Sequence, residues 1–126
     1  MNILSVLIGG AIGSLLRYAT STYSYKIFGT DFPWGTLAVN LIGALMIGFL
    51  WGMSDRFEFS TNTRNFIFVG ILGGFTTFSS FALENFNLIK GGEMNLALIN
   101  IGVQNIAGLA LVYIGFICSK LIFKSI

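Results

Sequence analysis

The chain has very few charged residues and no histidine. Of its 126 residues, 7 are Lys or Arg and 5 are Asp or Glu, which is 10% against about a quarter in typical soluble proteins. So few charges do not cover a surface that faces water, which excludes a soluble fold. The lack of histidine and the single cysteine, Cys118, exclude internal disulfides, Cys/His zinc sites and histidine-based triads. An enzyme is therefore not expected.

Apolar residues and glycine are abundant instead. The hydrophobic set makes up 55% of the chain, with 16 glycines in addition, and the mean hydropathy is +0.83. A helix that spans a membrane needs roughly 20 mainly apolar residues, and four segments have this length: about 2–23, 34–53, 65–89 and 94–123. We therefore predict an all-α membrane protein with a single transmembrane domain in the cell membrane. The net charge of +2 comes from scattered residues, so no nucleic-acid partner is expected.

The positive residues that flank these segments show only a weak bias toward one side of the membrane. One side carries Arg56, Arg64, Lys120 and Lys124, and the other carries Lys26 and Lys90. Positive residues orient membrane proteins, so a bias this weak is compatible with insertion in both orientations. Small four-helix proteins that insert in this way can form antiparallel dimers. A single orientation with a modest preference is equally compatible.

Two polar residues stand out in the first two spans. Arg17 lies within the first apolar segment, where an arginine is costly unless it reaches an interface or a protein contact. We favour a structural or vestibule role for it. Asn40 shares a helical face with Thr36 and Gly43 by i, i+4 and i+7 spacing. Its amide serves either as an interhelical hydrogen bond or as a donor to an anion in a pore, and spacing does not separate the two.

The third span contains the most unusual segment, residues 70–84. Here Gly73 and Gly74 precede a Thr/Ser-rich stretch, which predicts a helix break near 73–80. A break at this depth is tolerated where it is buried in protein or lines a cavity. Converging carbonyl groups at the break could bind a hard cation, or the nearby hydroxyls could compensate for the break without any ion.

Two phenylalanines follow the break on one helical face. Phe78 and Phe81 have i, i+3 spacing and lie beside the hydroxyls of Thr77 and Ser80. Aromatic residues at this spacing usually only pack, yet the positive ring edges could hold a small anion and reject cations. Glu84, one turn beyond Ser80, is expected near the mouth of such a path.

The fourth span carries several amides. Packing hydrogen bonds are the expected role of Asn100 and Gln104. Asn105, Leu109 and Tyr113 share one face, which predicts a polar stripe with one apolar interruption.

These residues together resemble the Fluc family of fluoride ion channels along nearly the whole chain. The resemblance rests on Gly35-Thr36-Leu37 followed by Val39-Asn40, and on the segment Gly73-Gly74-Phe75-Thr76-Thr77-Phe78-Ser79-Ser80-Phe81. It implies an antiparallel homodimer with dual topology, two fluoride pathways and a structural Na⁺ ion at the dimer interface. The function implied is passive, selective export of fluoride, which relieves fluoride toxicity.

The resemblance also implies roles for individual residues. They are the box phenylalanines Phe78 and Phe81, the pore asparagine Asn40, the adjacent polar residues Thr77, Ser80 and Asn105, the vestibule residues Arg17 and Glu84, and the sodium-binding carbonyls of Gly73 and Thr76, shared with the second copy. Leu109 and Tyr113 depart from the family, which often has serine or threonine at these positions.

Two other functions remain as alternatives. A small dual-topology multidrug exporter shares the chain length and the four helices, but it relies on a glutamate in the first span, and the first span here has no acidic residue. A membrane assembly subunit that transports nothing would use the polar residues only for helix packing.

Overall fold

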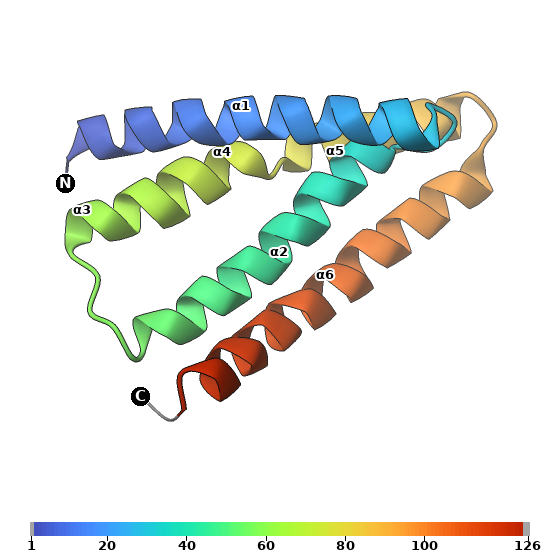
Figure 1. Ribbon diagram of the computed structural model, residues 1–126. Coiled ribbons are helices and arrows are strands. Elements are labelled where there is room, and N and C mark those ends of the chain that lie inside the picture. The colour runs from blue at the N-terminus through green and yellow to red at the C-terminus, as the bar shows by residue number, and fades with distance from the viewer. Residues whose placement is uncertain (1, 125–126) are drawn as a thin grey trace.

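The computed structural model describes residues 2–124, which form a helical protein with four long apolar spans (Figure 1). Three spans are single helices, α1 (Ile3–Phe28), α2 (Trp34–Ser54) and α6 (Met94–Ile122). The remaining span runs from Thr61 to Lys90. All four are long and apolar enough to cross a membrane, which confirms the predicted all-α membrane class.

The third span is a composite of four helical pieces. They are α3 (Thr61–Arg64), a π-helix (Asn65–Leu72), α4 (Gly73–Phe75) and α5 (Phe78–Lys90). Thr76 and Thr77 between α4 and α5 have extended backbone angles. The interruption is therefore narrower than the predicted stretch of 73–80, and the glycine pair itself is helical.

The first helix is longer than expected, because it ends at Phe28 and not near Tyr23. The polar residues after Tyr23 resemble a connecting loop in sequence, but their polar groups are satisfied within the helix, as the Ser24 hydroxyl donates to the Thr20 carbonyl at 2.8 Å. The helix ends where Gly29 adopts a φ of +87°, a conformation that favours glycine.

The helices pack in two pairs through small residues. α1 lies against the π-helix and α4, and α2 lies against α6 (Figure 1). A side chain on Gly9 would overlap the Phe66 carbonyl of the π-helix, and one on Gly115 of α6 would overlap the Leu45 carbonyl of α2. Lipid provides no hydrophobic drive for helix association, so this close backbone approach supplies the packing contacts.

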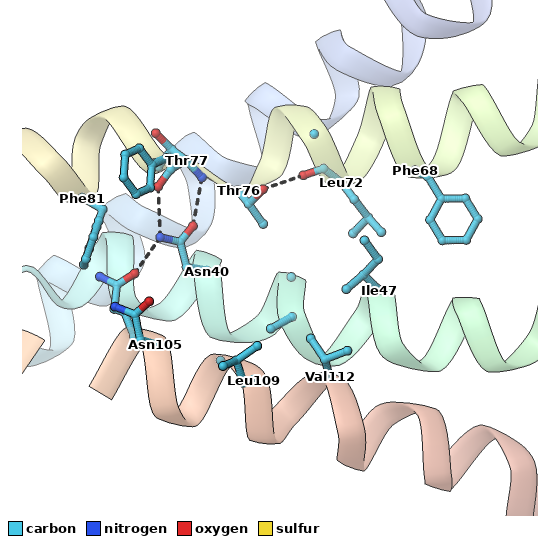
Figure 2. Close-up of a pocket in the computed structure, with 16 residues that line it drawn as sticks. Asn40, Ile47, Phe68, Leu72, Thr76, Thr77, Phe81, Asn105, Leu109 and Val112 are labelled. Atoms are coloured by element: carbon cyan, nitrogen blue, oxygen red, sulfur yellow. Dashed lines mark hydrogen bonds between the residues drawn. The ribbon is translucent and has the colours of Figure 1, made fainter. Parts of the chain in front are cut away.

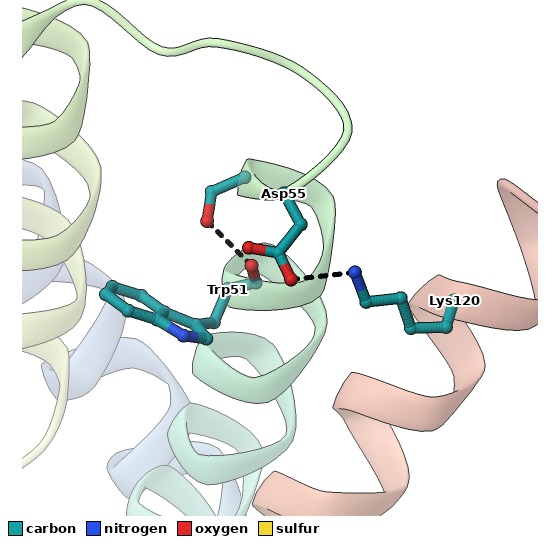
Figure 3. Close-up of polar contacts among 4 residues, drawn as sticks. Trp51, Asp55 and Lys120 are labelled. Atoms are coloured by element: carbon teal, nitrogen blue, oxygen red, sulfur yellow. Dashed lines mark hydrogen bonds and ion pairs between the residues drawn. The ribbon is translucent and has the colours of Figure 1, made fainter.

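The connections lie at both ends of the helices. Residues 29–33 and 91–93 lie at one end, and residues 55–60 lie at the other with the N-terminal part of α1 and the last turn of α6 (Figure 1). There, Lys120 donates to Asp55 at 2.7 Å and joins α6 to α2, next to a hydrogen bond from the Ser54 hydroxyl to the Trp51 carbonyl (Figure 3). Because both charged side chains are exposed, this pair contributes at most about 1 kcal/mol.

Candidate functional site

The break in the third span is held by the side chain of Asn40. The Thr77 N–H donates to Asn40 Oδ1 at 2.9 Å, and Asn40 Nδ2 donates back to the Thr77 carbonyl at 3.0 Å (Figure 2). Thr77 is extended, with φ −151° and ψ 124°, so the amide of Asn40 pairs with it as a neighbouring strand would. Asn40 thus forms an interhelical hydrogen bond, one of the two roles expected for it.

The Thr77 hydroxyl also replaces a lost helical bond, whereas the Thr76 hydroxyl adds a second bond to a carbonyl that still accepts from the Thr76 N–H at 3.1 Å. Thr76 Oγ1 donates to the Leu72 carbonyl at 3.0 Å, and Thr77 Oγ1 accepts from the Ser80 N–H at 3.2 Å as the N-cap of α5. In a continuous α-helix the Thr77 N–H would bond to the Gly73 carbonyl, but here it is bonded to Asn40. The Gly73 carbonyl is therefore left free of its usual helical partner.

A groove of about 510 Å³ runs along this region between α2, the third span and α6 (Figure 2). It brings together the predicted residues Asn40, Gly73, Thr76, Thr77, Phe78, Phe81 and Asn105. Among the described residues that line it, none is charged. The groove therefore offers amides, hydroxyls, backbone groups and aromatic rings to a ligand.

The phenylalanine pair lies at the groove. The ring centroids of Phe78 and Phe81 are 5.6 Å apart, with an angle of 47° between the ring planes. Phe78 is 78% exposed, so most of this side chain is not covered by residues 2–124. Both rings lie directly after the break, because Thr77 caps the helix that carries them.

Only some residues of the predicted polar stripe on α6 line the groove. Asn105 and Leu109 line it, whereas Tyr113 is outside its lining. Asn105 is exposed, and its Nδ2 donates to the Ile101 carbonyl of its own helix at 2.8 Å. Leu109 is 74% exposed, so an apolar side chain follows Asn105 along the groove.

Three predicted residues lie outside the lining of this groove. Ser80 contributes its backbone N–H to the Thr77 cap. Glu84 lies beside a second, smaller pocket of about 240 Å³ near the connection at 29–33, and its Oε1 accepts from the Thr36 hydroxyl at 2.7 Å. Arg17 is partly exposed on α1, and within residues 2–124 the ion pair joins Lys120 to Asp55, so no carboxylate there pairs with Arg17.

The structure also reveals a role for amides that residue spacing did not assign. Asn40 Nδ2 donates to Gln104 Oε1 at 2.7 Å, and Gln104 and Asn100 continue the chain of hydrogen bonds to Asn85. Asn100 and Gln104 were expected to make packing hydrogen bonds, but Asn85 was missed. Asn85 and Asn100 lie at similar distances from the connection at 91–93, and this symmetry of a helical hairpin could have identified the pair.

Comparison with known proteins places the chain in a family. The family described as CrcB-like protein, Camphor Resistance (CrcB), matches residues 4–116. The chain belongs to the CrcB family. This match includes every residue of the groove.

Curated relatives of this CrcB-family chain have nearly the same length. A protein of Parabacteroides distasonis named fluoride-specific ion channel FluC is 48% identical over 121 residues, which is 96% of this chain and 94% of the relative. Proteins of the same name from Hydrogenovibrio crunogenus and Citrifermentans bemidjiense are 40% and 45% identical, covering 98% and 88% of this chain and 95% and 90% of the relatives. These similarities confirm the resemblance based on the glycine–threonine–phenylalanine segment of the third span.

Proposed function

We propose that this protein is a fluoride-selective channel that lets fluoride leave the cell passively and so relieves fluoride toxicity. The observation that carries the proposal is the similarity over 96% of the chain to a protein named fluoride-specific ion channel FluC, at 48% identity. The groove at the interrupted third span is the candidate ion path, since aromatic rings, amides and hydroxyls line it together.

The chemistry of the groove supports an anion over a cation. Aromatic ring edges carry partial positive charge, and Phe78 and Phe81 flank the groove beside the Asn40 amide. The described lining residues carry no charge, so an anion would be held by partial charges alone. Binding of this moderate strength allows an ion to enter and also to leave, as conduction requires.

We further propose that a second copy of the chain, inserted in the opposite orientation, completes the path. The exposed amide of Asn105 and the exposed ring of Phe78 leave one side of the groove open. Polar groups at membrane depth are costly when they face lipid, so protein must cover this side. The weak positive-residue bias is compatible with both orientations, as an antiparallel homodimer needs.

A structural Na⁺ ion at the dimer interface fits the residues at the break. The Gly73 carbonyl lacks its usual helical partner, and Gly73 lines the groove. Carbonyl oxygens suit a hard cation. The carbonyls of Gly73 and Thr76 from both copies would together provide four oxygens to such an ion, whose charge would hold the two breaks together.

The deciding experiment is ion efflux from liposomes that contain the purified protein. Fluoride efflux should exceed that of protein-free liposomes, and chloride efflux under the same gradient should not. Equal chloride and fluoride efflux, or no protein-dependent fluoride efflux, would refute the proposal. Absence of both fluxes would favour an assembly subunit, whereas proton-coupled efflux of an organic cation would favour a multidrug exporter.

A further inference from the structure

Four side-chain amides form a continuous chain of hydrogen bonds that runs from the break through α2 and α6 to α5. Asn40 Nδ2 donates to Gln104 Oε1 at 2.7 Å, Gln104 Nε2 donates to Asn100 Oδ1 at 3.0 Å, and Asn100 Nδ2 donates to Asn85 Oδ1 at 2.9 Å. Asn100 is fully buried, and Asn85 is 6% exposed. We call these four residues the amide relay.

The backbone of Thr77 determines the direction of the whole relay. The Thr77 N–H can only donate and its carbonyl can only accept, so Asn40 must turn its oxygen to the former and its nitrogen to the latter. The second hydrogen on this nitrogen then needs an acceptor, which is the Gln104 oxygen. The same reasoning orients the amides of Gln104 and Asn100. In each hydrogen bond of the relay, the amide nearer to Thr77 along the chain of bonds is therefore the donor.

The last amide of the relay agrees with this direction. Asn85 accepts from Asn100 through its oxygen, and its Nδ2 is buried without a hydrogen-bond partner among residues 2–124. Rotation of this amide would form no additional hydrogen bond, because the Asn85 nitrogen would then face the Asn100 nitrogen, which is also a donor. Hydrogen bonds that point the same way polarise one another, so the relay strengthens the hold on Asn40.

We propose that Gln104, Asn100 and Asn85 are positioning residues that reinforce the orientation which the Thr77 backbone imposes on the Asn40 amide at the groove. In this orientation the partly negative Oδ1 is covered by the Thr77 N–H and does not repel an anion in the path. A rotated amide would bring this oxygen against two other oxygens, those of Thr77 and Gln104. The consequence for ion flux rests on the proposed fluoride function, whereas the orientation itself does not.

Asn100 provides the cleanest test, because it does not line the groove and reaches Asn40 through Gln104. Asn100→Leu keeps the branched shape of the side chain with a somewhat larger volume, and it removes one acceptor and one donor from the relay. Gln104→Met removes the next link and serves as the second variant should Asn100→Leu not fold. Asn95→Leu is the matched control, because Asn95 is an exposed amide on the same helix.

Two measurements read the orientation of Asn40. Hydrogen exchange of the Thr77 backbone amide, followed by NMR in micelles, should become about threefold to tenfold faster in both relay variants, as expected for weakening one hydrogen bond. Exchange of the α2 amides should stay unchanged. Fluoride efflux from liposomes should fall by a similar factor, with a lower ratio of fluoride to chloride, while Asn95→Leu leaves both quantities within about twofold of the parent.

A purely structural role gives a different result. If the relay variants lower the thermal stability but leave Thr77 exchange and the fluoride-to-chloride ratio unchanged, the positioning proposal is wrong. If the parent protein carries no fluoride, the proposed function fails, and the Thr77 exchange rates alone then decide whether the relay orients Asn40.

Discussion

Replacing Asn40 with leucine tests the central structural contact of the site. Leucine has the same branched side-chain skeleton as asparagine and a somewhat larger volume, so the change removes hydrogen bonds without leaving a cavity. It takes away three of them, two to the Thr77 backbone and one to Gln104. A polar contact between membrane helices contributes about 0.6 kcal/mol on average, and a typical protein hydrogen bond contributes up to about 1.5 kcal/mol. Loss of the three bonds should therefore lower the free energy of unfolding by about 2–4.5 kcal/mol.

The free energy of unfolding should be measured by titration with a denaturing detergent in mixed micelles, monitored by circular dichroism. Asn95→Leu is the control, because it makes the same chemical change at an exposed position of α6. Thr77 backbone exchange should also accelerate strongly, because its N–H loses its partner. A loss of stability below about 0.5 kcal/mol, the range of ordinary surface substitutions, would refute the conclusion that Asn40 holds the break.

Two further predictions concern the aromatic pair and the helix packing. Phe78→Ile and Phe81→Ile keep an apolar side chain but remove the positive ring edge. Each should lower fluoride efflux from liposomes about tenfold or more, and tenfold corresponds to about 1.4 kcal/mol. Unchanged efflux in both variants would contradict the role of these rings. Gly115→Ala should destabilise the protein by about 1–3 kcal/mol, because its Cβ would overlap a backbone carbonyl of α2. Gly102→Ala on the same helix meets no atom within 4 Å and should be neutral or stabilising in the same unfolding titration.

Much of the architecture is visible in the sequence. The shortage of charges and the four long apolar segments indicate a helical membrane protein, because lipid solvates neither charged side chains nor unpaired backbone. The Thr/Ser-rich stretch after Gly73 and Gly74 also indicates an interrupted third helix. These conclusions depend on composition and on short-range patterns, which hold whatever the helices pack against.

The exact position of the break depends on a residue far away in the chain. Both glycines are helical, and Gly74 lies where a side chain would overlap the Gly10 carbonyl of α1, so close packing explains this glycine. The extended residues are Thr76 and Thr77, because Asn40 on α2 supplies partners for the freed backbone groups. A local pattern does not show which residue of another helix will do this.

The sequence by itself therefore determined that this protein lies in a lipid membrane, that it is helical, and which segment is irregular. Tertiary structure decided which polar groups meet: the pairing of Asn40 with Thr77, the direction of the amide relay, and the separation of Glu84 from the groove. The physical reason is that burial in lipid depends on the sum of many side chains along one helix, whereas a hydrogen bond depends on two particular groups from different helices lying within about 3 Å of each other.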